Sequence, residues 1–79
     1  MIKIKNKEIK AYKSKLKQIR VSSGMTQEEL SKLSGINIKS IAAYEQNPEK
    51  INKASVESVY NLSDCLGCSM DDIIEKRYL

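Results

Sequence analysis

Histidine is absent from this 79-residue sequence, and glycine occurs only three times. Histidine is the usual general base and the usual partner that orients a nucleophile, so its absence argues against an enzyme. The glycines, Gly24, Gly35 and Gly67, are widely separated, and no glycine-rich loop is present to cradle a phosphate. We therefore expect no catalytic residues.

Only two cysteines are present, Cys65 and Cys68, and their spacing is one found in zinc sites and dithiol catalysts. A structural zinc needs four ligands, so a site here would have to be shared between subunits or recruit carboxylates. A dithiol centre usually places its first cysteine at a helix N-terminus, whereas Cys65 falls near a predicted helix end. We expect no metal and no cofactor, and interpret Cys68 as an apolar residue that packs back on its helix.

The sequence also lacks any apolar run close to the roughly 20 residues that span a bilayer. Its N-terminus alternates lysine with isoleucine, unlike the apolar segment of a signal peptide. A chain of this length forms one domain that buries only about 60% of its unfolded surface. We expect a cytoplasmic protein without a membrane segment, and no small-molecule ligand is evident.

Positive charge is concentrated at the start of the chain. Residues 1–20 carry seven lysines and one arginine against one glutamate, or +7, and residues 21–79 carry six basic and nine acidic side chains, or −3. Such a segment attracts a polyphosphate, because each neutralised phosphate releases counterions. The alternative is a solvated lysine tail. We expect residues 1–10 to be a basic arm, flexible or extended, and residues 11–79 to form the domain.

Residues 25–46 predict two short helices joined by a tight turn. Thr26 can accept from the backbone N–H of Glu29, whose carboxylate can reach back to the N–H of Thr26. Gly35 can adopt the left-handed conformation that ends this helix, and Asn37 can cap the next one. This order of signals predicts a helix-turn-helix.

The apolar side chains give each of these helices an inner face. Leu30 and Leu33 are expected on one face of the first helix, and Ile41 and Tyr44 on one face of the second. A helical wheel then turns the following residues of the second helix outward: Ile38 at its exposed start, Lys39, Ala42, Ala43 and Gln46.

Three more helices are predicted around this unit. One begins at Ile9 or Tyr12 and stops at residues 22–24. Pro48 ends the helix-turn-helix and opens a loop at residues 47–52. The fourth helix is expected to have an Asn52 cap, an end at Gly67 and one apolar stripe, made of Val56, Val59, Leu62 and Leu66. A last short helix is expected to start with Ser69 and Asp72 and to hold Ile73 and Ile74.

Residues 26–30, 34–36 and 41–45 resemble the phage-repressor or Cro-like helix-turn-helix family, also called the xenobiotic-response-element type, and the likeness extends over about residues 16–74. It implies an all-α, five-helix, lambda-repressor-like fold with the helix-turn-helix formed by helices 2 and 3. It also implies a sequence-specific transcription regulator, expected to be a repressor, that binds double-stranded DNA as a homodimer. The helix from Ile38 to Gln46 would enter the major groove.

The resemblance also assigns roles to individual residues. Gln27 would contact a DNA phosphate. Thr26 lies at the same helix N-terminus, whose backbone N–H groups would face that phosphate. Lys50 and Lys53 in the following loop are further candidates for phosphate contact. Apart from the resemblance, Lys17 lies off the apolar stripe of the first helix and could face either phosphate or water. The base-facing positions would be Asn37, Ile38, Lys39, Ala42 and Ala43. Arg20 would pair with Glu45 and fix the reading helix to the scaffold.

The base-facing set is more apolar than in better-known members, which tend to carry glutamine, arginine, serine or threonine at several of these positions. Ile38, Ala42 and Ala43 offer few polar groups for direct readout. DNA shape, the basic arm or a second subunit would then contribute to target choice. The alternative is a protein-interaction module on a repressor-like scaffold, such as an antitoxin-like or phage regulatory partner.

Overall fold

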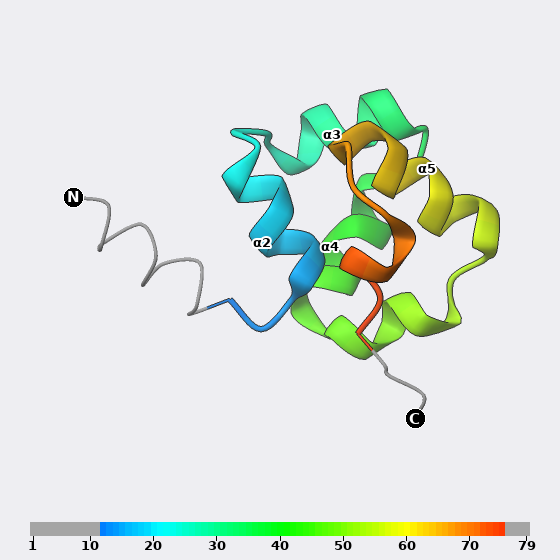
Figure 1. Ribbon diagram of the computed structural model, residues 1–79. Helices are drawn as coiled ribbons and strands as arrows, with labels where there is room; N and C mark the ends of the chain where they lie inside the picture. The colour runs from blue at the N-terminus through cyan, green and yellow to red at the C-terminus, as the bar shows by residue number, and fades with distance from the viewer. Residues whose placement is uncertain (1–11, 76–79) are drawn as a thin grey trace.

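The computed structural model describes residues 12–75, and these residues fold into helices joined by short connections (Figure 1). In chain order the α-helices and 3₁₀ helices are α2 (Lys15–Ser22), α3 (Gln27–Ser34), α4 (Ile38–Gln46), η1 (Pro48–Lys53), α5 (Val56–Leu66) and η2 (Met70–Asp72). No strand occurs in residues 12–75, and the predicted all-α fold is confirmed. The basic arm predicted at residues 1–10 lies outside the described residues.

The core collects apolar side chains from along the whole described chain. Helix α4 packs against α2, α3 and η1, and α5 packs against α3 and η2 (Figure 1). The buried side chains are Leu16, Leu30, Ile41, Ile51, Val59, Leu62 and Ile73. Each such burial removes apolar surface from water and contributes about 1.5–3 kcal/mol before entropy costs. The core therefore fixes how α3 and α4 lie against their neighbours.

The predicted signals at the ends of α3 and α4 are confirmed. Thr26 Oγ1 accepts from the N–H of Glu29 at 3.0 Å, and the Thr26 N–H donates to Glu29 Oε1 at 2.8 Å. Gly35 ends α3 with a φ of 77°. Asn37 Oδ1 then accepts from the N–H of Lys39 at 2.7 Å and caps α4. Gly35 and Asn37 together account for the short turn between the two helices.

Replacing Gly35 with alanine should lower the free energy of unfolding by about 1 kcal/mol, because L-residues are disfavoured at positive φ. An added Cβ would meet no atom within 4 Å, so the loss comes from the backbone and not from a clash. Urea unfolding measures this loss. Gly35→Asn is the matched control and should lose less, since asparagine tolerates this conformation. Equal stability of Gly35→Ala and the parent chain would contradict the prediction.

The fourth predicted helix begins later than the sequence indicated, and the prediction of Asn52 as its cap is wrong. Ser55 Oγ accepts from the N–H of Ser58 at 3.1 Å and caps α5. Residues 47–52 are also not an irregular loop, because Pro48 starts the 3₁₀ helix η1 with its φ already set. Asn52 Oδ1 instead accepts from the N–H of Glu75 at 3.0 Å.

Two apolar side chains expected on inner faces are exposed. Leu33 is 65% exposed, because the buried stripe of α3 runs through Leu30 and Ser34 and leaves Leu33 at its edge. Val56 is 74% exposed because it is the first residue of α5, where the helix projects beyond the core. The remaining residues of the predicted stripe in α5 either are buried or pack against the core.

The helices at both ends of the described chain are shorter than predicted. Helix α2 starts at Lys15, with Ser14 as its cap, and Tyr12 precedes it. At the other end η2 stops at Asp72, although its predicted capping box with Ser69 is present. Hydrogen bonds from the Ser69 backbone and hydroxyl lower the pKa of Asp72, so this cap weakens as pH falls through that lowered value.

The end of the described chain is held against the start of α2. The Lys15 N–H donates to Glu75 Oε2 at 2.6 Å, and Lys15 Nζ donates to the carbonyl oxygens of Asp71 at 3.0 Å and Ile74 at 2.9 Å. These bonds join residues more than fifty positions apart. Among residues 12–75, no helix combines the length and apolar character needed to cross a membrane.

Candidate nucleic-acid interface

A buried polar network joins α2, α3 and α4. Arg20 Nε donates to Glu45 Oε2 at 2.7 Å, and Arg20 Nη2 donates to Glu45 Oε1 at 2.9 Å. The two side chains are only 10% and 3% exposed. Arg20 Nη1 also donates to the carbonyl oxygen of Met25 at 2.8 Å, just before α3. The ion pair expected from the resemblance is therefore present and ties the end of α4 to the scaffold.

Gln27 is the third member of this network, which the sequence did not indicate. Its Nε2 group donates to Glu45 Oε1 at 2.9 Å. A carboxylate only accepts, so Glu45 fixes which end of the Gln27 amide points inward. Gln27 remains partly exposed, and the second N–H of Nε2 is left for an external acceptor. The contact places the first residue of α3 beside the end of α4.

The N-terminus of α3 also has free backbone donors. The capping box uses the N–H groups of Thr26 and Glu29. Among residues 12–75, the N–H groups of Gln27 and Glu28 have no acceptor. Backbone N–H groups at a helix start attract anions, and here they lie next to the Gln27 amide. Glu28 is exposed in the same turn and opposes that attraction.

The outward surface of α4 carries the five base-facing candidates. Ile41 and Glu45 are the buried residues of this helix. Of the candidates, three are exposed and the two alanines are partly exposed. We call these five residues the reading face: Asn37, Ile38, Lys39, Ala42 and Ala43. They lie within seven consecutive residues, the N-cap and first turns of α4, and none of them is buried.

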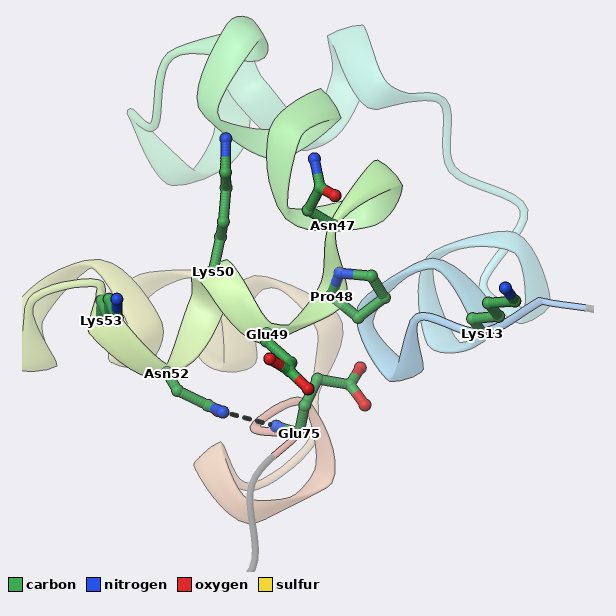
Figure 2. Close-up of a pocket in the computed structure, with 8 residues that line it drawn as sticks. All are labelled: Lys13, Asn47, Pro48, Glu49, Lys50, Asn52, Lys53 and Glu75. Carbon is green, nitrogen blue, oxygen red and sulfur yellow. Dashed lines mark hydrogen bonds between the residues drawn. The ribbon is translucent and has the colours of Figure 1, made fainter.

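The lysines proposed for phosphate contact have different surroundings. Lys50 and Lys53 are exposed on η1, which packs against α4, and with Lys13 they line an open groove of about 900 Å³. Figure 2 shows Lys50 pointing away from Glu49 and to the same side as Asn47. Lys17 lies with its Nζ 4.6 Å from the centre of the Tyr12 ring, which holds it by a cation–π contact.

Asn37 has fewer side-chain atoms available for DNA than its position in the sequence suggested. Its Oδ1 is held at the helix end by the bond from Lys39. Within the described part of the chain, no hydrogen bond engages its Nδ2 group. The free Nδ2 donor suits a phosphate or a guanine acceptor, whereas the bidentate contact with adenine would also need Oδ1, one lone pair of which the cap bond occupies.

The two cysteines pack against the core. Burial raises the pKa of the Cys65 thiol, and the negative charge of Asp64 raises it further. The pKa of the Cys68 thiol is likewise raised by burial and, to a smaller extent, by the negative charge of Asp72. Raised values keep the thiols protonated and poorly nucleophilic, in agreement with a structural role.

The fold and this interface define a helix-turn-helix DNA-binding domain: α3 and α4 form the motif, and exposed donors flank the outward face of α4. A family described as "Helix-turn-helix" matches residues 16–73. The chain belongs to this Cro-like, xenobiotic-response-element type family, and its fold is lambda-repressor-like. The family consists of DNA-binding regulators and not of enzymes. Searches of curated proteins and of solved structures found no match.

Proposed function

We propose that this chain regulates transcription by binding specific duplex DNA sequences, with α4 inserted in the major groove. The observation that carries the proposal is the link between Gln27 and Glu45, which joins a phosphate-binding helix start to the helix that carries the reading face. Phosphate contacts from Thr26 and Gln27 would set the register of the domain on DNA, and the reading face would select the bases. Lys50 and Lys53 would hold the backbone beyond the end of α4.

A repressor acting as a homodimer is the form of this function that we propose. Two copies would place their α4 helices in successive major grooves, with half-site centres about 10 base pairs apart. A bound dimer of this kind would occupy the promoter and exclude polymerase. Lys17 and the lysines of residues 1–10 would add attraction to the backbone without base selection.

Selection from a random duplex library at physiological salt, followed by sequencing of the bound pool, tests the proposal. An enriched palindrome with half-sites about 10 base pairs apart is the expected result. Retention that depends on salt without any enriched sequence would contradict sequence-specific reading. Absence of retention on DNA would favour the alternative of a protein-interaction module, which would use the same exposed Ile38.

Lys39→Ala should weaken binding to the selected site by about 1–3 kcal/mol and relax the preference at one base pair, because it removes a base-contacting donor. Lys50→Ala should weaken binding to all sequences alike and reduce the slope of log K against log salt by about one unit. Fluorescence anisotropy titrations at several salt concentrations separate these effects.

Lys32→Ala is the matched control, because it removes one positive charge as the other two substitutions do. Lys32 is exposed near the end of α3, in a groove lined by Met25 and Leu33 and by none of the residues of the reading face. Its removal should leave the base preference unchanged. Equal effects of all three substitutions on every sequence would show that α4 does not read bases.

A further inference from the structure

The reading face consists of two rows of side chains along α4. Ile38 and Ala42 are four residues apart and form an apolar row on successive turns. Lys39 and Ala43 form the second row in the same way. Ile38 is 40% exposed although it is a large apolar residue, so it presents carbon atoms to whatever approaches. Alanine at both second positions lets a ligand approach the helix closely.

Donors predominate among the polar groups of the reading face. The Lys39 ammonium has no acceptor atom, and the Asn37 carbonyl oxygen is held by the N-cap bond at 2.7 Å. Adenine N6 and cytosine N4 are donors in the major groove and need an acceptor from the protein. Lys39 therefore suits base edges that present acceptors, whereas the row of Ile38 and Ala42 suits base edges that present carbon.

Thymine meets this requirement most fully, since it presents a C5 methyl group beside the O4 acceptor. 5-Methylcytosine carries the same methyl group at the same ring carbon. An apolar contact from Ile38 and Ala42 depends on that methyl group and not on the atom bonded to C4. Guanine, with acceptors at O6 and N7, suits Lys39 on the neighbouring row.

We propose that Ile38 and Ala42 make this domain a reader of 5-methylpyrimidines, so that its DNA affinity responds to the methyl group of thymine and to that of methylated cytosine alike. The inference rests on the proposed function and identifies the chemical group that the reading face selects. Methylation of a cytosine under Ile38 would then strengthen binding without any other change in sequence.

Two pairs of duplexes that differ by one methyl group each test this inference. In the site obtained by selection, each thymine is replaced in turn by deoxyuridine, which removes only the methyl group. At the same positions, a cytosine–guanine pair is compared with its 5-methylcytosine counterpart. Binding of the full chain is measured by titration at constant salt, so the base-pair hydrogen bonds cancel within each pair.

The parent chain should lose about fivefold in affinity with the removal of one contacted methyl group, in both pairs. Ile38→Ala should reduce this methyl effect below about twofold, because alanine leaves the contact mostly unfilled. Leu33→Ala is the matched control: Leu33 is 65% exposed on α3, outside the reading face, and its loss should leave the methyl effect unchanged. Circular dichroism melting checks that both variants remain folded.

Each outcome separates this inference from the proposed function. A methyl effect in both pairs that Ile38→Ala removes supports it, and the tighter of the thymine and 5-methylcytosine duplexes identifies the natural base. Enriched sites with no methyl effect at any position would overturn the inference and leave the regulator intact. A methyl effect confined to thymine would also overturn it. Failure to select any sequence would instead overturn the proposed function.

Discussion

Replacement of Glu45 with alanine should lower the free energy of unfolding by about 3 kcal/mol, because it leaves the buried Arg20 guanidinium without its partner. Among residues 12–75, Arg20 would keep only the Met25 carbonyl oxygen as an acceptor, and its side chain is 10% exposed, so water does not replace the lost carboxylate. For a domain of this size the melting temperature should fall by more than about 10 °C. Thermal melting followed by circular dichroism measures both quantities.

The double variant Arg20→Met with Glu45→Leu is the control for this prediction. It removes both charges and fills the same space with apolar side chains, so its stability should return to near that of the parent chain. Glu45→Gln should fall between the two, because its amide keeps one acceptor for Arg20 but loses the charge. An unchanged melting curve for Glu45→Ala would show that the pair does not stabilise the fold.

Gln27→Glu should reduce DNA affinity by about 3 kcal/mol, or roughly 100-fold, for all sequences alike. The new carboxylate would lie at the phosphate-binding end of α3 and beside Glu45, whose Oε1 now accepts from Gln27 at 2.9 Å. The substitution replaces the amide donor with an acceptor and sets a negative charge against both the DNA phosphate and Glu45. Titration with the selected duplex and with an unrelated duplex should give the same proportional loss.

Two further variants separate the contact from the change in charge. Gln27→Ala removes the donor without adding charge and should lose about tenfold. Asn61→Asp adds the same negative charge on α5, outside the helix-turn-helix, and should change affinity only slightly. All binding is measured below the melting temperature of each variant. Equal losses for Gln27→Glu and Asn61→Asp would show that net charge, and not the phosphate contact, controls affinity.

The positions of the helix-turn-helix boundaries could be predicted because their causes are local. The Thr26 capping box, the Gly35 turn and the Asn37 cap each act over three residues or fewer, and the structure contains all three. The wrong boundary was the start of α5, where two cap residues competed. Asn52 and Ser55 are both good cap residues, and the 3₁₀ helix after Pro48 decided in favour of Ser55.

The sequence by itself determined the order of the helices, the turn that joins α3 to α4 and the family to which the chain belongs. The tertiary structure decided which apolar residues are exposed, as at Leu33, because burial depends on where the neighbouring helices pack. It also decided that Gln27 shares Glu45 with Arg20, across 18 positions of sequence. Contacts between side chains far apart in the chain arise only when the core fixes the helices, so no local spacing predicts them.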